Sequence, residues 1–387
     1  MLHTVKVRPN LVEEFWSELE TYEQTCLDPS ALLDYRGFNF PSFDSAWRQD
    51  FLRDVNFDHA TFSGDVNFGF AKFHSDVSFE NATFTGLARF NYTKIRGNAS
   101  FEGATFQGNA SFELAMFGGD ASFDFATIET RLAFGGETFG ATVSFRSLVV
   151  HEKANISFRW LEDLVYEGHR GPVDLTRSSF LHTNIEKFEF GAARWQDRPE
   201  WWGLRHTTRC LSDEFSHDPG ELLGVSQNYA QLVLNHQAKR DYEAAEDFHI
   251  GEMECRRKAL GASWPPFTKW LRRRLLNSYI IYRTLSNYGS SWPRALFWLL
   301  LAIVGFAGGV WLTGGLTDLR PGATSGTVVT DYESALLYIA SIAAFQRDRF
   351  YEPTTTAGRW IASGAAFAIL GQFALVLFAL RRRFKRD

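Results

Sequence analysis

The sequence predicts a β-solenoid followed by an α-helical segment with two transmembrane helices. Three observations lead to this fold class. Phe occurs 37 times in 387 residues, and most of these lie between Phe38 and Phe190. Within that stretch a small residue and a large one recur two positions apart. The longest uncharged apolar runs all lie after residue 290. A chain of this length has room for two or three domains, so both parts fit.

The repeat advances in steps of five and six residues, which gives a period of eleven. Right-handed coiled coils share that period. In a helix, however, residues five apart lie about 140° round the axis, so Phe57 and Phe62 could not share a seam. A plain strand fails as well, because steps of five break its alternation of period two. Sixteen small-x-large pairs follow the rule: Val55/Phe57, Ala60/Phe62, Val66/Phe68, Ala71/Phe73, Val77/Phe79, Ala82/Phe84, Ala88/Phe90, Thr93/Ile95, Ala99/Phe101, Ala104/Phe106, Ala110/Phe112, Ala115/Phe117, Ala121/Phe123, Ala126/Ile128, Leu132/Phe134 and Val143/Phe145.

A coil of short straight faces joined by tight corners satisfies both constraints. Each face points its small and large residue inward, and polar triplets such as GDA and GNA make the corners. Four faces give roughly 22 residues per coil, with coils stacked roughly 4.8 Å apart. Phe should then stack on Phe along the axis, and one coil could not be stable alone. A last irregular coil is expected at Val173-Asp-Leu175, Phe180, Ile185 and Phe188.

This pattern resembles the pentapeptide-repeat family, whose repeats have a central Leu or Phe and usually an Ala two residues before it. Here the centre is Phe, and every second repeat has one extra residue. The resemblance implies a right-handed quadrilateral β-helix over residues 38–190, with an N-terminal helical cap over 1–37. It also implies a scaffold or recognition surface for an unknown cytoplasmic protein or ligand, and a bacterial source.

Charge bears on one function within that family, because some pentapeptide proteins are acidic rods that imitate DNA and bind topoisomerases. Between Asp54 and Val150 the sequence has 11 acids and six bases, a balance of about −5. That is mild, and the whole chain also carries a formal net charge of only −5. Such a balance indicates no general affinity for nucleic acid. A DNA mimic is therefore the least favoured function, and no nucleic-acid partner is expected.

Residues 191–262 predict a helical adaptor made of a helix pair. Tyr229, Leu232 and Val233 share the apolar face of the first helix. The second ends in the basic run Arg256-Arg257-Lys258, which complements the helix macrodipole. The run RDYEAAEDFHIGEMECRRK resembles a block found in membrane-bound pentapeptide proteins, placed between repeat and membrane segments.

The adaptor holds the only residues that suggest chemistry, and their spacing does not support it. Glu252 and Glu254 are two apart on a helix and face different directions, which makes a poor acid–base pair. No Walker loop, G-x-S-x-G or dinucleotide fingerprint occurs. Three cysteines in no C-x-x-C pair fit a reducing compartment. We therefore expect no enzyme, no cofactor and no metal site, since four potential ligands match no zinc spacing: His236, His249, Cys210 and Cys255.

Two uncharged segments predict transmembrane helices, Ala295–Thr317 with 23 residues and Trp360–Leu380 with 21. At 1.5 Å per residue, the shorter one spans about 31 Å, close to the hydrocarbon thickness of a bilayer. A buried helix of a soluble protein is the alternative. The N-terminal sequence MLHTVKVRPNLVEEFW has no apolar h-region and so indicates no signal peptide.

Basic clusters flank the two spans and predict their orientation. By the positive-inside rule, both termini and the solenoid lie in the cytoplasm, and the protein lies in the inner (cytoplasmic) membrane. Residues 263–294 mix basic and apolar side chains, as in an amphipathic helix on anionic headgroups, with a solvated linker as the alternative. A basic tail follows over 381–387. The candidate interface residues are Lys269, Arg272, Arg273, Arg274, Arg283 and Arg294 before the first span, and Arg381, Arg382, Arg383, Lys385 and Arg386 after the second.

The loop over 318–359 contains an apolar segment, residues 332–345, with helical periodicity. It is too short to span a membrane, which predicts a re-entrant or interfacial half-helix. A polar return, residues 353–358, follows. Over residues 293–383 this order resembles the pore module of two-helix potassium channels. The T-V-G-Y-G filter, whose carbonyls coordinate potassium, is replaced by AAFQRDRF, so potassium selectivity is not expected.

If four copies met round an axis, four residues could line an external mouth: Gln346, Arg347, Asp348 and Arg349. Their net positive charge would favour anions or low selectivity. The alternative is a solvated loop tip. Five glycines in the spans allow close helix packing, which supports an oligomer or a tight hairpin equally: Gly305, Gly308, Gly309, Gly364 and Gly371.

Together these patterns predict a homo-oligomer, tetrameric if channel-like, in which a cytoplasmic solenoid senses or binds a partner and regulates a pore. The alternative is a membrane-anchored scaffold for protein–protein interaction that does not conduct. The sequence names no ligand, stimulus or permeating ion.

Overall fold

The computed structural model describes residues 9–25, 32–43, 50–136, 138–159, 172–191, 193–199, 207–215, 218, 220–262, 278–319, 327–344 and 350–384. The chain divides into two compact units. The first holds Met1–Glu200 and Arg205–Ala259, and the second holds Trp201–Leu204 and Leu260–Asp387. Each unit is described separately below.

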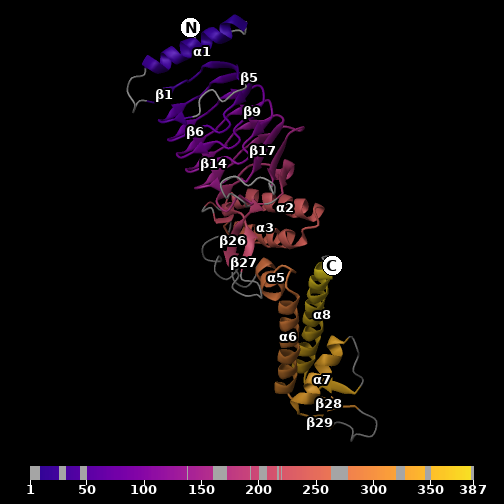
Figure 1. Ribbon diagram of the computed structural model, residues 1–387. Helices are drawn as coiled ribbons and strands as arrows, with labels where there is room; N and C mark the ends of the chain where they lie inside the picture. The colour runs from indigo at the N-terminus through magenta and orange to yellow at the C-terminus, as the bar shows by residue number, and fades with distance from the viewer. Residues whose placement is uncertain are drawn as a thin grey trace. The chain divides into compact units, whose positions relative to one another are not determined.

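The first unit contains a β-solenoid of about six turns (Figure 1). Its strands pair in parallel with the strands 22 residues away: Leu33 pairs with Val55, and Val55 with Val77. One sheet consists of β1 (Leu33–Asp34), β4 (Val55–Asn56), β7 (Val77–Ser78), β11 (Ala99–Ser100), β15 (Ala121–Ser122), β19 (Val143–Ser144) and β23 (Ser178–Ser179). Its register is 22 residues as far as β19, which is the period expected from the sequence, and the last step, from Val143 to Ser178, is longer.

A second sheet has five strands: β3 (Asp50–Phe51), β6 (Lys72–Phe73), β10 (Lys94–Ile95), β14 (Met116–Phe117) and β18 (Thr138–Phe139). The third serves two faces of the coil, because β5 (Thr61–Asn67) pairs with β8 (Thr83–Phe84) at one end and β9 (Ala88–Arg89) at the other. Its other strands are β2 (Asn39–Phe43), β12 (Thr105–Phe106), β13 (Ala110–Ser111), β16 (Thr127–Ile128), β17 (Arg131–Gly135), β20 (Val149–Val150), β21 (Asn155–Arg159) and β24 (Phe188–Phe190). A regular turn thus has four strand positions, while its handedness and square section stay predictions.

The interior is a set of aromatic columns, as the repeat predicts. Phe79, Phe101 and Phe123 are fully buried and stack with ring centroids 5.0 and 4.9 Å apart and interplanar angles of 5° and 4°. Phe90 and Phe112 stack at 4.7 Å in a second column. Because the coils rise by one strand spacing, each ring lies at van der Waals distance from the ring above it.

Two corners of the coil place residues in the left-handed region. One corner recurs every 22 residues and includes His59 (φ 58°), Asn81 (φ 55°) and Gly103 (φ 66°). The other includes Phe70 (φ 64°) and Tyr92 (φ 61°), whose rings stack with their centroids 4.7 Å apart. A positive φ is uncommon for residues other than Gly and Asn, so the stacked coil imposes this geometry on the corner.

Helices close both ends of the solenoid. At the N-terminal end α1 (Pro9–Thr25) buries Phe15 against Phe40, and its Tyr22 hydroxyl donates to the Asp34 carbonyl at 2.8 Å. The first strand begins at Leu33, earlier than the residue 38 expected. At the other end lie β22 (Val173–Asp174), β25 (Ala193–Arg194), β26 (Gln196–Pro199), β27 (Thr207–Cys210), η2 (Ile185–Lys187), η3 (Ser212–Phe215), α2 (Leu222–Ala238) and α3 (Tyr242–Ala262).

The second unit is built round two long helices, α6 (Trp292–Leu312) and α8 (Thr356–Phe384), which lie side by side (Figure 1). The short helices α5 (Ser278–Ser286) and α7 (Tyr332–Ala343) pack against both of them. A three-stranded antiparallel sheet of β28 (Leu316–Asp318), β29 (Val328–Val329) and β30 (Tyr351–Pro353) joins the elements of the loop.

The loop differs from the sequence expectation at both edges. The first span ends at Leu312, not at Thr317, because Gly314 (φ 110°) and Gly315 (φ 76°) turn the chain into β28. The polar return expected over residues 353–358 contains the end of β30 at Pro353 and the start of α8 at Thr356. These strands are too short and too far apart in sequence to give a signal. Residues 263–277 of the expected interfacial helix lie outside the described residues.

Candidate functional site

The last coil of the solenoid is closed by polar side chains, not left as an open sheet edge. Asp213 accepts the Phe180 backbone N–H at 2.7 Å, while burial raises the pKa of its carboxyl group. Four side chains along α2 bond to main-chain groups of the coil: Asn228 Nδ2 to Phe180 O at 2.7 Å, Gln231 Oε1 to Ile185 N at 2.8 Å, Asn235 Nδ2 to Phe188 O at 2.6 Å and Lys239 Nζ to Phe190 O at 2.9 Å. Unpaired edge groups would otherwise invite pairing with another chain.

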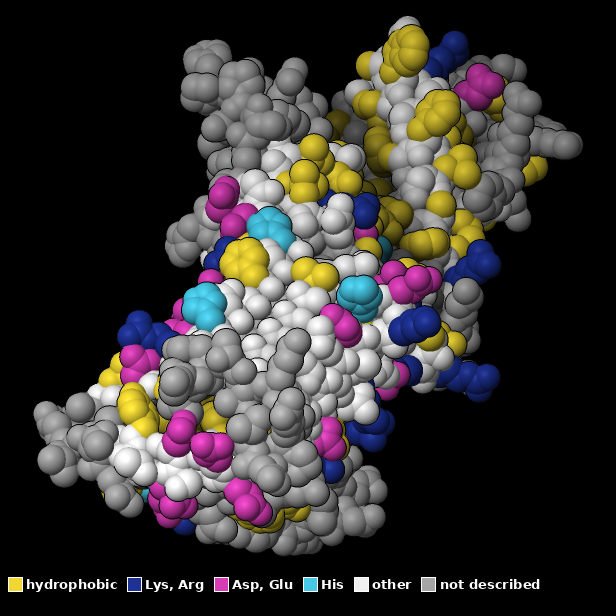
Figure 2. Space-filling view, turned by 90° about the horizontal axis from the view of Figure 1, so that it is seen from above, with side chains coloured by type: hydrophobic (Ala, Val, Ile, Leu, Met, Phe, Trp, Pro, Cys, Tyr) yellow, Lys and Arg dark blue, Asp and Glu magenta, His cyan; other side chains and the backbone are white. Residues whose placement is uncertain are grey.

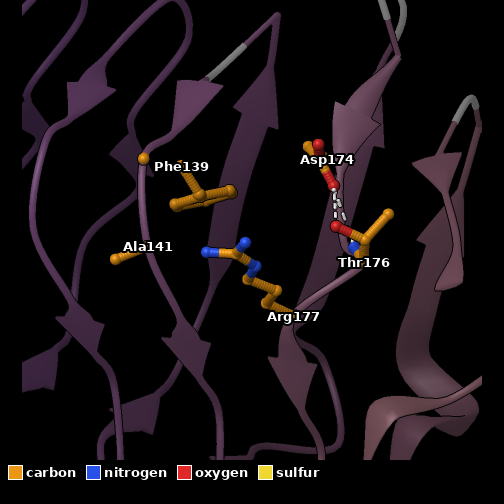
Figure 3. A pocket seen from close by; sticks show the side chains of 6 residues that line it. Phe139, Ala141, Asp174, Thr176 and Arg177 are labelled. Atoms are coloured by element: carbon orange, nitrogen blue, oxygen red, sulfur yellow. Dashed lines mark hydrogen bonds between the residues drawn. The ribbon is translucent and has the colours of Figure 1, made fainter.

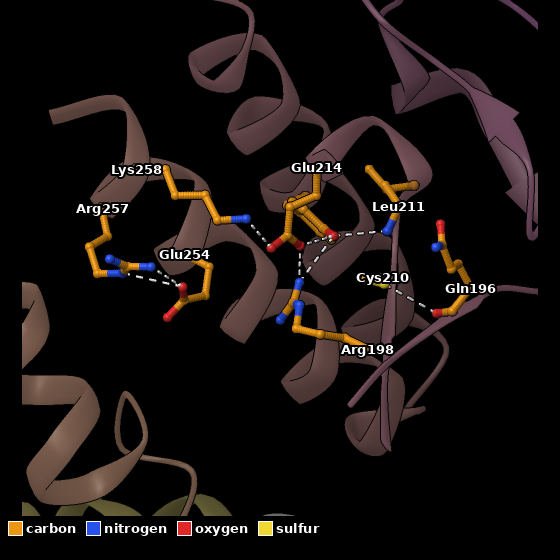
Figure 4. Close-up of polar contacts among 9 residues, drawn as sticks. Gln196, Arg198, Cys210, Leu211, Glu214, Glu254, Arg257 and Lys258 are labelled. Carbon is orange, nitrogen blue, oxygen red and sulfur yellow. Dashed lines mark hydrogen bonds and ion pairs between the residues drawn. The ribbon is translucent and has the colours of Figure 1, made fainter. Parts of the chain in front are cut away.

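Next to these hydrogen bonds, which we call the polar seam of α2, lies a buried charge cluster centred on Glu214 (Figure 4). Its carboxylate, with 1% of the side chain exposed, accepts hydrogen bonds from the Arg198 guanidinium, from Lys258 Nζ at 3.0 Å and from the Tyr229 hydroxyl at 2.9 Å. The Leu211 backbone N–H donates to the same hydroxyl at 2.8 Å. One carboxylate therefore ties β26, α2 and α3 together. A buried charge with this many partners is a strong structural constraint.

Burial favours the neutral form of three groups round Glu214. Burial raises the pKa of Tyr229, and it raises the pKa of the Cys210 thiol to about 12. Burial likewise raises the pKa of Cys255. A thiol must lose its proton to act as a nucleophile or metal ligand. Neither cysteine is therefore poised for that chemistry.

The remaining candidates of the adaptor have separate partners. His236 Nδ1 lies 3.1 Å from Asp241 Oδ2, and His249 Nδ1 lies 3.4 Å from Glu252 Oε2. Glu254 forms an ion pair with Arg257 at 2.8 Å. Within the described residues, no three His, Cys, Asp or Glu side chains gather as metal ligands would. These contacts hold the elements of the adaptor together.

One comparison with known proteins identifies the repeat. Residues 71–116 match the family model described as pentapeptide repeats (9 copies). The repeat region is a pentapeptide-repeat solenoid. No curated protein and no solved structure matches this chain. The matched residues include neither the cap, the adaptor nor the second unit, so these parts are interpreted from their own geometry.

The acids on one corner of the pentapeptide-repeat solenoid support its own main chain. Asp76 Oδ1 accepts the Asn98 backbone N–H of the next coil at 2.7 Å, and Asn98 Oδ1 accepts that of Asp120 at 2.9 Å. Asp120 in turn accepts the Thr142 N–H at 2.9 Å, and hydrogen bonds from Thr142 lower the pKa of Asp120. These hydrogen bonds give the corner acids a structural role. The neutral side chain of Asn98 lies between Asp76 and Asp120, so the corner does not carry a continuous row of negative charges.

The second unit carries the membrane candidates. Helices α6 and α8 are long and apolar enough to cross a membrane, and only 22% and 28% of their apolar windows are buried. The core helix of a soluble protein would be mostly buried, so this exposure favours membrane association. Hydrophobic side chains reach the surface in patches (Figure 2). On these two helices they include Phe297, Leu300, Trp311, Trp360, Phe367 and Leu377.

One amide joins the two candidate spans. Gln372, 5% exposed on α8, donates from Nε2 to the Ala295 carbonyl at 2.7 Å near the start of α6. It also reaches the Leu285 carbonyl of α5 at 3.5 Å. Gln372 is the only amide side chain in 360–380, a signal that sequence analysis overlooked. In apolar surroundings no water competes for the Ala295 carbonyl, so this hydrogen bond can hold the two helices together.

The five glycines do not share one role. A Cβ on Gly309 would lie 3.2 Å from Ile361 Cγ2 of α8, so this glycine lies at the contact of the two helices. A Cβ on any of the other four would meet nothing within 4 Å: Gly305, Gly308, Gly364 and Gly371. These four therefore lie away from the α6–α8 contact within one chain.

Most of the predicted charged sites fall outside the described residues. The mouth candidates Gln346, Arg347, Asp348 and Arg349 do, as do Lys269, Arg272, Arg273 and Arg274. Arg283 lies in the last turn of α5, and the Arg294 guanidinium donates to its carbonyl at 3.5 Å. Arg381, Arg382 and Arg383 extend α8 beyond its apolar stretch.

Proposed function

We propose that the protein is a membrane-embedded, oligomeric, channel-like protein whose cytoplasmic pentapeptide-repeat solenoid binds a partner and regulates the membrane unit. Helix α7 is the observation that supports this best. It has 12 apolar-rich residues, or about 18 Å, and so is too short to cross a bilayer. Its Asp331 N-cap accepts the Ser334 N–H at 2.8 Å, and it packs against both α6 and α8. A span, a short packed helix and a second span follow in that order.

The helix contacts also support the proposed orientation. Since Gln372 of α8 bonds to Ala295 near the start of α6, the basic flank before α6 and the basic flank after α8 lie at the same end of the pair. Arg283, Arg294 and Arg381 belong to those flanks. By the positive-inside rule this end is cytoplasmic, which puts both termini and the solenoid on that side of the inner membrane.

Native mass spectrometry of the purified protein in nanodiscs, with conductance recorded from the same sample in planar bilayers, tests the proposal. We expect a defined ring, four chains if channel-like, and a current altered by Arg347→Ala or Arg349→Ala. Arg96→Ala on the solenoid is the matched control and should leave the current unchanged. Gly364→Leu, on the open side of α8, should weaken the ring. A silent monomer or dimer would refute the pore.

A membrane-anchored scaffold without conduction is the second candidate. The observation that favours it is the composition of the spans. Residues 295–312 and 360–380 carry no ionisable side chain, and their one amide is used between helices. If this candidate is right, the solenoid should bind its partner equally well whether or not the membrane unit forms a ring. A pull-down that compares the wild type with the ring-weakening variant Gly364→Leu tests this.

A further inference from the structure

The five-stranded ladder of the solenoid ends one coil before the first sheet does. Its last strand is β18, and β22, which lies beside β18, pairs with β25 instead. The first sheet continues past this level, because β19 pairs with β23. Two of the four strand positions therefore end in this coil, at β18 and at β20, while the other two continue through β23 and β24. An opening of about 220 Å³ lies at the interruption, lined by Phe139, Gly140, Ala141, Asp174, Thr176 and Arg177 (Figure 3).

The interruption leaves a hydrogen-bond acceptor at the edge of β18. In this ladder the residue after a strand donates its N–H to the preceding coil: Gly118 donates to the Ile95 carbonyl at 2.7 Å and Gly140 to the Phe117 carbonyl at 2.6 Å. The Ile95 and Phe117 carbonyls thus face the following coil, and Phe139 holds the equivalent position in β18. After β18 no strand follows in the ladder, and among the described residues none donates to the Phe139 carbonyl.

Two opposite charges line the same opening without pairing. Figure 3 shows the Arg177 side chain extending toward Phe139 and Ala141, while Asp174 and Thr176 turn toward each other. Asp174 Oδ1 accepts the Thr176 N–H at 2.9 Å and its hydroxyl at 2.6 Å. Within the part of the chain that is described, Arg177 forms no ion pair and Asp174 Oδ2 accepts no hydrogen bond. Arg177 is exposed, so a solute can reach it.

We propose that this opening binds a small α-amino acid as its zwitterion. The planar guanidinium of Arg177 matches a carboxylate, which it can hold with two parallel hydrogen bonds. The carbonyl of Phe139 and the carboxylate of Asp174 supply the acceptors that an ammonium group needs. The volume is below that of drug-sized pockets, which favours a small ligand. A phosphate dianion fits less well, because Arg177 is the one cation among the described lining residues and Asp174 adds a negative charge to the same opening.

Saturation-transfer NMR on the full-length protein in detergent tests the proposal, with alanine as the probe. Acetate lacks the ammonium group and ethylamine lacks the carboxylate. We expect saturable alanine binding, with acetate and ethylamine each bound at least tenfold more weakly. Arg177→Gln should weaken alanine binding at least tenfold. Asp174→Asn keeps the Oδ1 acceptor of the turn but removes the charge, and should weaken alanine at least fivefold without weakening acetate.

The matched control is Arg96→Gln, an exposed arginine beside the same ladder, which should bind alanine as the wild type does. Thermal unfolding confirms that each variant is folded. Three results would overturn the proposal: no saturable alanine signal, acetate bound as tightly as alanine, or unchanged binding in Arg177→Gln. The site belongs to the solenoid alone, so a lack of conductance in bilayers would not contradict this proposal.

Discussion

At the scale of single residues, Glu214 has the largest structural consequence in the first unit. It lies fully inside the adaptor, whereas its partners come from three elements far apart in the sequence: Arg198, Tyr229 and Lys258. Sequence spacing gives no sign of such a cluster. Its residues are of ordinary types, and only the fold brings them together.

We expect Glu214→Gln to destabilise the first unit by about 3–5 kcal/mol, because the largely buried Arg198 and the partly exposed Lys258 lose their counter-charge. Chemical denaturation followed by circular dichroism measures this. Glu102→Gln is the control, since Glu102 is exposed and forms no ion pair among the described residues, and it should change stability by less than about 0.5 kcal/mol. Similar losses in both variants would contradict the role given to Glu214.

His236 makes the adaptor sensitive to acid. Burial lowers its pKa, and the hydrogen bond to Asp241 offsets part of this. Lys239 and Arg209 also lower the pKa, and Phe248 packs against the ring at 5.2 Å. The folded state thus favours the neutral ring. Its stabilising contribution is complete above the unfolded pKa, about 6.5, and is lost as the pH falls through the lower folded value.

We therefore expect the wild type to lose more stability than His236→Gln between about pH 7 and about pH 5.5. The comparison cancels the other histidines, which both proteins share. Unfolding midpoints measured at several pH values decide the matter. Parallel pH profiles would mean that His236 does not titrate differently in the two states.

At the scale of elements, the coil depends on unbroken aromatic columns. Phe101 lies between Phe79 and Phe123 and is fully buried. Phe101→Ala should cost about 3–5 kcal/mol of unfolding free energy, since the cavity also removes two stacked partners. Phe125→Ala is the matched control, because Phe125 is 59% exposed at a corner, and it should have an effect of less than about 0.5 kcal/mol. Denaturation curves of the two variants that coincide would argue against the columns as the core.

The α6–α8 pair depends on one small residue in the same way. Gly309→Leu should lower the stability of the pair by about 1–3 kcal/mol, because even its Cβ would lie 3.2 Å from Ile361 Cγ2. Gly305→Leu adds the same side chain where nothing lies within 4 Å, and should leave the pair intact. Thermal unfolding in detergent distinguishes them, and an equal effect of both would place the helix contact elsewhere.

At the scale of the whole molecule, the chain consists of two units with different cores. The first has one continuous core from Phe15 in the cap to Cys255 in α3. The second has its own core, which includes Leu299, Ala335 and Ile369. The adaptor is thus part of the solenoid unit, through the hydrogen bonds of α2 to the last coil, and does not act as a loose linker.

Two separate thermal transitions should follow from this division. Glu214→Gln should shift only the transition of the first unit, and Gly309→Leu only that of the second unit. Calorimetry in detergent, with near-ultraviolet circular dichroism as a second probe, measures both. A single transition shifted by either substitution would show that the units unfold together.

The sequence by itself determined the elements whose physics is periodic or local. The small-x-large period requires a 22-residue coil with stacked Phe, because only that geometry buries every large residue. Two uncharged runs of membrane length predict the long helices in the same way, and the apolar segment from Tyr332 predicts α7 to within two residues at its end. Hydrophobic periodicity is a property of neighbouring residues, so it is readable without the fold.

Only the tertiary structure decided where coils end and which distant side chains meet. The Glu214 cluster, the polar seam of α2, the sheet of β28–β30 and the opening beside Arg177 all join residues tens of positions apart. Gly309 and Gly305 look alike in sequence, yet one lies against Ile361 and the other faces outward. Such pairings depend on the relative placement of packed elements, which no local pattern of residues encodes.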